Sequence, residues 1–170
     1  MEKKIEPTLI LVLGPQGSGK ETFGKCFKNS FLRTFPFLSL EEGIRKRISF
    51  CFFSDLQNVK EIELIKKAKD KGYKAIGYCL FASRLCCQER NRFKYLSKGE
   101  MWNSFSFRED YENFYSSLLE IYSSLDMVFF VENQKNFHFV GVYNVDNVPM
   151  SSFEKALRKE KGNCDKIAKI

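Results

Sequence analysis

The first part of the chain contains the pattern that most limits how it can fold: an apolar run, a glycine-rich loop and a helical repeat in direct succession. The run 8–13 (TLILVL) is continuous, which is typical of a strand buried on both faces of a parallel sheet. The loop 14–19 (GPQGSG) follows it directly. Phe23, Phe27 and Phe31 then recur every four residues, which is the spacing of one helical face. The order predicts a strand, a tight turn and a helix.

Apolar runs and helical repeats alternate along the rest of the chain. The apolar runs predict strands at 36–40, 48–53, 75–81 and 127–131, with an edge strand or hairpin at 137–145. Helical periodicity predicts helices at 59–71, 84–96, 108–124 and 151–162. This alternation predicts an α/β fold with a parallel sheet covered by helices on both faces. We expect one domain over 1–170, with a lid or flap near 97–107 and a basic C-terminal tail near 161–170.

The glycine-rich loop has the spacing of a phosphate-binding loop. It reads G-x-x-x-x-G-K, follows a predicted buried strand and opens a predicted helix, which is the context that this motif requires. The main-chain N–H groups at its end would surround a phosphate, and the lysine side chain would reach the β- and γ-phosphates. The motif therefore predicts a three-layer P-loop NTPase fold and a site for ATP or GTP, formed by Gly14, Gly17, Ser18, Gly19 and Lys20.

The residue after the lysine is unusual. A Ser or Thr hydroxyl normally binds Mg²⁺ there, but this chain has Glu21, with Thr22 one position later. Glu21 either points to solvent or binds the Mg²⁺ itself, because carboxylates are ordinary ligands of hard cations. Thr22 is placed to donate a hydrogen bond to the α-phosphate.

An acid at the end of the run 48–53 is the expected second half of such a site. Asp55 follows that run and is expected to hold Mg²⁺, through water or directly, or to act as a base. The alternative is that Asp55 only caps the helix that follows.

The loop and the next segment resemble those of the nucleoside monophosphate kinases, the adenylate kinase group. That group has a non-hydroxyl residue after the lysine and then Thr, as Lys20–Thr22 do here. The stretch LSLEEGIRKRI resembles the S-x-G-D-x-x-R segment of these enzymes, with Glu42 at the Asp and Arg45 at the Arg. The resemblance implies that Glu41, Glu42 and Arg45 meet the acceptor substrate, with Glu42 as a second candidate base. A solvated helix face explains the same residues.

A second resemblance covers roughly residues 9–145. The stretches AKDKGYKAIGYCLF and SRLCCQERNRF, and the long helix that starts REDYENF, are similar to those of the zeta toxin group of P-loop kinases. This resemblance implies that Arg90, Arg92 and Arg108 are lid arginines that bind phosphate oxygens during transfer. Surface charge is the alternative for each.

Composition narrows the class of protein. Lys and Arg number 28 against 21 Asp and Glu, a net charge of +7, which favours anionic partners. Six cysteines without a C-x-x-C pair, and a single histidine, argue against a zinc site and for a reducing, cytoplasmic setting. No apolar run reaches the length of about 20 residues that a membrane-spanning helix needs.

The expected function is ATP-dependent phosphotransfer to a small-molecule acceptor such as a sugar nucleotide, nucleoside or nucleotide, as in the zeta toxins. Two alternatives stay open. One is a catalytically impaired nucleotide-binding module that acts through a partner protein such as an antitoxin, because the D-G-F-P-R segment of the monophosphate kinases has no counterpart here. The other is a polynucleotide-end kinase, because the chain is basic.

Overall fold

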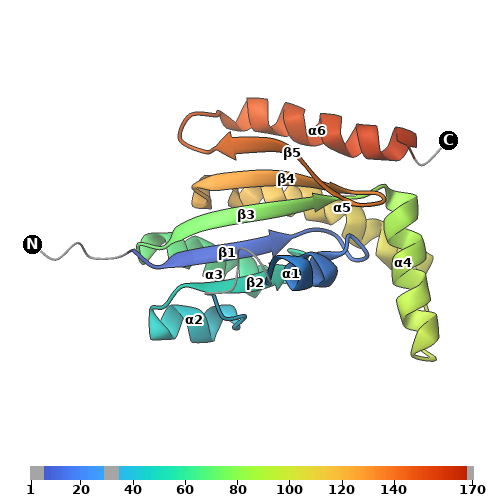
Figure 1. The fold of residues 1–170 in the computed structure, drawn as a ribbon, viewed down its shortest axis with the longest axis horizontal. Coiled ribbons are helices and arrows are strands. Elements are labelled where there is room, and N and C mark those ends of the chain that lie inside the picture. The colour runs from blue at the N-terminus through green and yellow to red at the C-terminus, as the bar shows by residue number, and fades with distance from the viewer. Residues whose placement is uncertain (1–5, 29–34, 168–170) are drawn as a thin grey trace, which may run out of the picture.

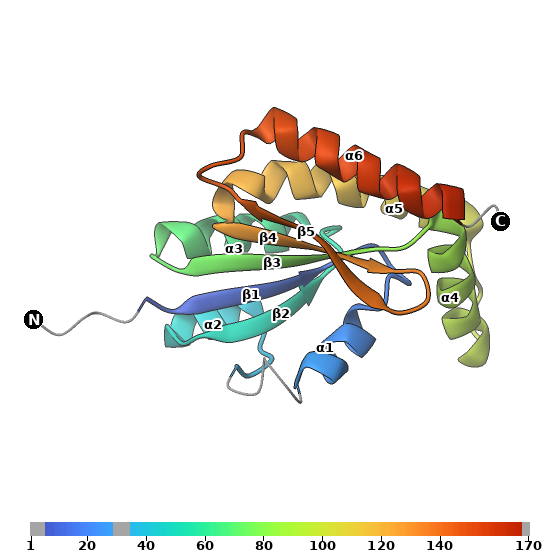
Figure 2. The same ribbon diagram turned by 45° about the horizontal axis from the view of Figure 1, so that its top comes forward.

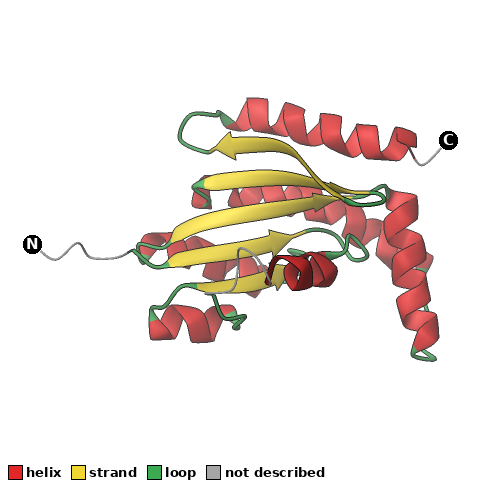
Figure 3. Cartoon of the chain, viewed as in Figure 1, coloured by secondary structure: helices red, strands yellow, loops and turns green. Residues whose placement is uncertain are grey.

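Five strands form one sheet in the order β2-β1-β3-β4-β5 (Figures 1 and 3). The computed structural model describes residues 6–28 and 35–167. Strands β1 to β4 are parallel, and β5 lies antiparallel to β4 at the edge. The strands are β1 (Thr8–Leu13), β2 (Phe50–Ser54), β3 (Lys74–Phe81), β4 (Met127–Asn133) and β5 (Phe137–Asn144).

Helices cover both faces of the sheet, as predicted. They are α1 (Lys20–Lys28), α2 (Leu40–Lys46), α3 (Val59–Asp70), α4 (Arg84–Ser97), α5 (Ser104–Ile121) and α6 (Met150–Ile167), with a 3-10 turn at Tyr122–Ser124. Figure 2 shows α1 on one side of the sheet and α3, α5 and α6 on the other. Helix α4 stands at the carboxyl ends of the parallel strands, the right-hand end in Figure 1. The fold is therefore a three-layer α/β sandwich with α4 at the edge where parallel sheets bind ligands.

Strand β1 is buried on both faces, as its continuous apolar run predicts. Leu9, Leu11 and Leu13 pack into the larger core cluster, which includes residues of α3, α5 and α6. Ile10 and Val12 pack into the smaller cluster. Because alternate residues point to opposite faces, the six residues of β1 anchor the following loop from both sides of the sheet.

The α1 helix packs through Phe23, which is fully buried in the smaller cluster. This confirms the inward position of the first aromatic residue in the predicted repeat. Phe31 and the Phe27 side chain lie outside the part of the molecule that the structure describes.

The strand predicted at 36–40 is wrong. Only Phe37 forms an isolated bridge, to Cys51 of β2, and α2 begins at Leu40. The reason is a capping signal in S-L-E-E: the Ser39 hydroxyl accepts a hydrogen bond from the N–H of Glu42 at 3.2 Å. The cap satisfies a main-chain N–H group in the first turn of a helix, which the apolar side chains of the run cannot do. The helix therefore begins at Leu40, inside the predicted strand.

Two other boundaries differ from prediction, one because of a helix cap and the other because of burial. Asn103 caps α5 by accepting from the N–H groups of Phe105 and Ser106, so the predicted flap is reduced to the loop 98–103. Helix α6 continues to Ile167, so residues 161–167 of the predicted tail are helical. Cys164 is buried near the end of α6, and burial of this apolar side chain favours the extension. Among the described helices, none is both long and apolar enough to cross a lipid bilayer.

Candidate functional site

The loop between β1 and α1 is held in place by its glycines. Gly17 and Gly19 have φ values of +81° and +92°, which residues with a side chain rarely adopt. A Cβ at Gly17 would lie 2.2 Å from the main-chain oxygen of Cys87 in α4, and one at Gly19 would lie 2.4 Å from Nδ2 of Asn133. Both glycines therefore allow a close approach that brings the loop against α4 and the end of β4.

Further hydrogen bonds tie the loop to the sheet. The N–H of Gly14 donates to the Ser54 carbonyl at 3.3 Å, which joins the start of the loop to β2. The Asn133 side chain donates to the Ser18 carbonyl at 2.8 Å, and the N–H of Ser18 donates to the Pro15 carbonyl at 3.1 Å. The loop is thus fixed by contacts to two strands before any ligand binds.

Lys20 opens α1 and turns back over the loop. Its Nζ donates to the carbonyls of Gly14 at 2.7 Å and Pro15 at 3.1 Å. Burial lowers the pKa of Lys20, and the negative charge of nearby Asp55 opposes part of that effect. The ammonium group is therefore pre-positioned beside an acid that the chain supplies from another strand.

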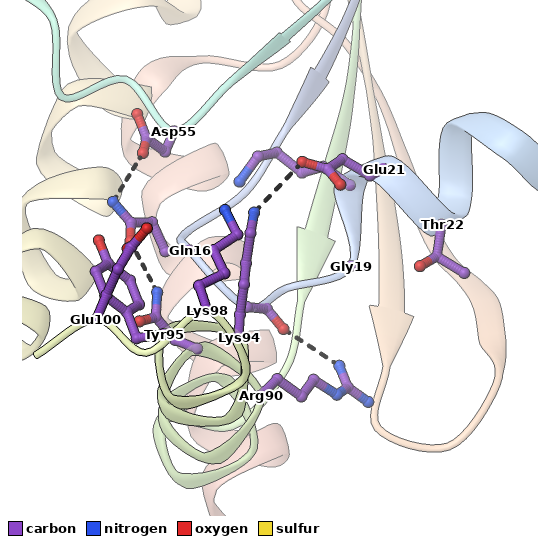
Figure 4. A pocket seen from close by; sticks show the side chains of 13 residues that line it. Gln16, Gly19, Glu21, Thr22, Asp55, Arg90, Lys94, Tyr95, Lys98 and Glu100 are labelled. Atoms are coloured by element: carbon purple, nitrogen blue, oxygen red, sulfur yellow. Dashed lines mark hydrogen bonds and ion pairs between the residues drawn. The ribbon is translucent and has the colours of Figure 1, made fainter. Parts of the chain in front are cut away.

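A cavity of about 600 Å³ lies in front of the loop, a size in the range that small-molecule sites occupy (Figure 4). Its walls come from the loop and α1, from the end of β2, and from α4 with the loop that follows it. The lining residues are Gln16, Gly17, Gly19, Lys20, Glu21, Thr22, Asp55, Arg90, Asn91, Lys94, Tyr95, Lys98 and Glu100. The cavity therefore contains most of the predicted nucleotide-binding residues together with Asp55, whereas Gly14 and Ser18 lie outside its lining.

Glu21 faces α4 across the opening of the cavity. Its Oε1 lies 3.6 Å from Nζ of Lys94, and Figure 4 shows this ion pair. Both side chains are mostly exposed, so the pair contributes little to stability. Thr22 lies one residue further along α1, exposed at the edge of the cavity.

Asp55 is not the cap of the following helix. The N-cap of α3 is Asn58, whose side chain accepts from the N–H of Lys60 at 3.0 Å. Asp55 instead accepts from the N–H of Gln57 at 3.3 Å through Oδ1 and from the side chain of Gln16 at 3.4 Å through Oδ2. The helix-cap alternative is therefore excluded, and the carboxylate faces the loop.

The predicted lid arginines have different surroundings. Arg90 lines the cavity, but its guanidinium donates to three main-chain carbonyls: Gly17 at 3.4 Å, Asn133 at 3.1 Å and Gln134 at 3.1 Å. Arg92 and Arg108 are exposed and lie outside the cavity lining. The lysines Lys94 and Lys98 line it instead.

The Arg90 contacts predict a structural contribution. We expect Arg90→Ala to lower the free energy of unfolding by about 2 kcal/mol, the usual value of hydrogen bonds to a charged group. Arg92→Ala, two residues along the same helix and exposed, is the matched control and should leave stability unchanged. Urea unfolding of the two variants measures the difference, and equal stabilities would contradict a structural role for Arg90.

The predicted acceptor residues lie on α2, apart from the cavity lining. Glu42 pairs with Lys46 at 2.6 Å, and Glu41 pairs with Lys60 at 3.2 Å. Arg45 is exposed. In Figure 1, α2 lies at the opposite end of the sheet from α4. Their role toward an acceptor stays a prediction.

Sequence reasoning missed the polar face that α4 turns to the cavity. Asn91, Lys94, Tyr95 and Lys98 recur at helical spacing, and this period is the signal that could have revealed them. Asp110 of α5 was missed as well. Burial raises the pKa of its carboxyl group, and the charge of Asp55 adds to the effect. The Gln57 side chain, two residues after Asp55, donates to the Asp110 carbonyl at 2.9 Å.

Several solved structures have a fold similar to that of this chain. The fold is similar to a chain in the PezAT chromosomal toxin–antitoxin system of Streptococcus pneumoniae, with a TM-score of 0.66 and 11% identity over 94% of this chain and 79% of that one. It is also similar to a protein of Chloroflexus aurantiacus j-10-fl described as a kinase candidate, with a TM-score of 0.53 and 13% identity over 91% and 98% of the two chains.

A third similar structure is AvrRxo1-ORF1:AvrRxo1-ORF2 with sulphate ions, with a TM-score of 0.53 and 11% identity. It covers 93% of this chain, which spans 64% of the AvrRxo1 chain. No protein-family model and no curated protein sequence matches the chain. At these identities the comparisons establish the fold alone, an α/β fold of the P-loop NTPase type that is similar to the PezAT chain, as the sequence predicted.

Proposed function

We propose that this protein is an ATP-dependent phosphotransferase acting on a small-molecule acceptor. The observation that carries the proposal is that one cavity contains both Lys20 of the phosphate-binding loop and Asp55 from the end of β2. Phosphoryl transfer needs mainly positioning and neutralisation of charge, and a base for a hydroxyl acceptor. Lys20 supplies the positive charge and Asp55 supplies the base.

The loop and its cations fit the phosphates of a nucleotide. The N-terminus of α1 carries partial positive charge. The Lys20 ammonium donates to two loop carbonyls, and a bound phosphate oxygen would replace them as its hydrogen-bond acceptor. Lys94 and Lys98 approach from the α4 side. We assign Thr22 to the α-phosphate and this group of cations to the β- and γ-phosphates.

The acids of the cavity fit a magnesium ion only with help from the substrate. In the described part of the chain no three Asp, Glu, His or Cys side chains gather closely enough to hold a metal by themselves. Asp55 would hold Mg²⁺ directly or through water, and Glu21 would reach it only by leaving Lys94. When bound, Mg²⁺ neutralises charge on the transferred phosphate.

In this proposal Asp55 takes the proton of the acceptor hydroxyl while Lys20 stabilises charge on the γ-phosphate. Arg90 holds the loop through its carbonyl contacts. A sugar nucleotide, nucleoside or nucleotide would enter beside Asp55. We also propose that the protein acts in the cytoplasm, where ATP is available and where its six unpaired cysteines stay reduced.

Nucleotide turnover with a panel of acceptors tests the proposal. We expect radiolabelled phosphate to pass from ATP or GTP to at least one sugar nucleotide, nucleoside or nucleotide. Asp55→Asn should lower kcat by about a hundredfold or more while ATP affinity stays within a few fold, because a general base acts on the rate. If ATP does not bind and no acceptor is phosphorylated, the proposal is wrong.

A second candidate function is nucleotide binding without turnover, in the service of a partner protein. The Glu21–Lys94 ion pair supports it, because Glu21 stands where the general phosphate-binding loop motif has a magnesium-binding hydroxyl. Two of the similar structures come from a toxin–antitoxin system and a two-protein complex, which makes an antitoxin-like partner worth testing. Tight ATP binding without turnover, unchanged by Asp55→Asn, would favour this candidate. Oligonucleotide acceptors in the panel test the polynucleotide-kinase alternative.

A further inference from the structure

Three side chains outside the predicted set connect the loop after α4 to Asp55 by hydrogen bonds. Nε1 of Trp102 donates to Oδ1 of Asn91 at 3.0 Å, and Nδ2 of Asn91 donates to Oε1 of Gln16 at 2.7 Å. Nε2 of Gln16 then donates to Oδ2 of Asp55 at 3.4 Å. Figure 4 shows the Gln16 side chain between α4 and Asp55. The series therefore runs from the loop 98–103, through α4 and the phosphate-binding loop, to the end of β2.

The chemistry of the two end groups gives the series one direction. An indole N–H can only donate, so Asn91 must turn its oxygen to Trp102 and its NH₂ group to Gln16. Gln16 must then accept with its oxygen, which turns its own NH₂ group to Asp55. An ionised carboxylate only accepts, so it is the matching end of the series. Reversing any amide would place two donors or two acceptors face to face.

The surroundings hold the first part of the series in place. Asn91 is only 5% exposed, so its amide has little access to water as an alternative partner. The Trp102 ring packs beside Phe107 of α5, with ring centroids 6.1 Å apart. The loop that carries Trp102 also supplies Lys98 and Glu100 to the cavity wall. The position of this loop is therefore connected to the orientation of Asp55.

We propose that Trp102, Asn91 and Gln16 are positioning residues that hold the Asp55 carboxylate oriented toward the bound acceptor. The proposal rests on the proposed function, because it assigns Asp55 its support as the base. The N–H of Gln57 holds the other carboxylate oxygen, Oδ1. Each oxygen of Asp55 thus accepts from one donor and keeps a lone pair for the proton of the acceptor hydroxyl.

Kinetics of three variants test the role in catalysis. We expect Gln16→Leu and Asn91→Leu to lower kcat by about tenfold to a hundredfold, the usual effect of removing the partner of a reacting group. The KM for ATP should change less than kcat, because the phosphate contacts stay. Trp102→Phe keeps an aromatic side chain but removes the N–H donor together with the five-membered ring of the indole. Its loss in kcat should be smaller, because Trp102 is three hydrogen bonds away from Asp55. Phe93→Ala, on the exposed side of α4, is the control and should leave kcat unchanged.

A second measurement does not depend on kinase activity. Trp102 is the only tryptophan of the chain, so the indole N–H gives one NMR signal from the full-length protein. We expect Asp55→Ala to shift this signal although the two side chains are three hydrogen bonds apart. The same substitution in a Gln16→Leu background should leave the signal where it was. Gln16 lies in a partly exposed loop, so this background breaks the series without emptying the buried Asn91 position.

The outcomes separate the two proposals. The positioning role would be overturned if Asp55→Ala left the chemical shift of the indole N–H unchanged. It would also be overturned if the Gln16→Leu and Asn91→Leu variants had wild-type kcat. If wild-type protein phosphorylates no acceptor but the indole signal responds as expected, the hydrogen-bond series is supported and the phosphotransferase function is what fails.

Discussion

Lys20→Ala is expected to lower the rate of phosphotransfer by about a hundredfold to a thousandfold, the range measured when one preorganised donor to transition-state charge is removed. The Lys20 ammonium lies at hydrogen-bonding distance from two loop carbonyls, so it is already where the phosphates would bind. Alanine leaves the transferred phosphate without this charge. Steady-state kinetics with the best acceptor measure the loss, and calorimetry measures the accompanying loss of ATP affinity.

Lys25→Ala is the matched control for Lys20→Ala. Lys25 lies on the same helix and is exposed, so the variant changes the net charge equally and should keep wild-type kinetics. Thermal unfolding of both variants tests whether lost activity reflects lost fold. A Lys20→Ala protein that binds ATP and turns it over like the control would contradict the assignment of the cavity as a nucleotide site.

Gly17→Ala is expected to damage both stability and ATP binding. The new Cβ would lie 2.2 Å from the Cys87 carbonyl oxygen, a main-chain atom of α4 that moves only if the helix moves. The positive φ adds strain of about 1 to 2 kcal/mol, and overpacking against a rigid neighbour adds about 1 to 3 kcal/mol. A shift of α4 would also displace Arg90 and Asn91 from the loop. Urea unfolding and ATP titration measure the two losses.

Gly72→Ala separates the strain from the clash. Gly72 has almost the same φ, +80° against +81°, but a Cβ there would meet no atom within 4 Å. We expect Gly72→Ala to cost only the strain and to leave ATP affinity unchanged. If the two variants lose the same stability and Gly17→Ala binds ATP normally, the close packing of the loop against α4 has no functional importance.

Structure formed by residues near each other in the chain could be predicted well from the sequence. Contacts between residues that only folding brings together could mostly not be predicted. The β1 strand matches its predicted range, and the loop and the start of α1 follow it as the motif requires. The predicted strand at 36–40 failed because the Ser39 cap outweighed a short apolar run. Asp55 was predicted from its position after an apolar run, and the structure brings it to the cavity because neighbouring parallel strands end at the same edge of the sheet.

The strand–loop–helix unit follows from the amino-acid sequence, because a doubly buried strand, glycines at positive φ and a lysine at the start of a helix are local requirements. Which side chains of α4 face the cavity depends on how that helix packs in the folded protein. The rotation of that helix is set by Gly17 and Asn133, which lie far from it in the chain. That packing turns Arg90 toward the carbonyls of the loop and places Lys94, Lys98 and Asn91 in the cavity wall, where the link from Trp102 to Asp55 forms.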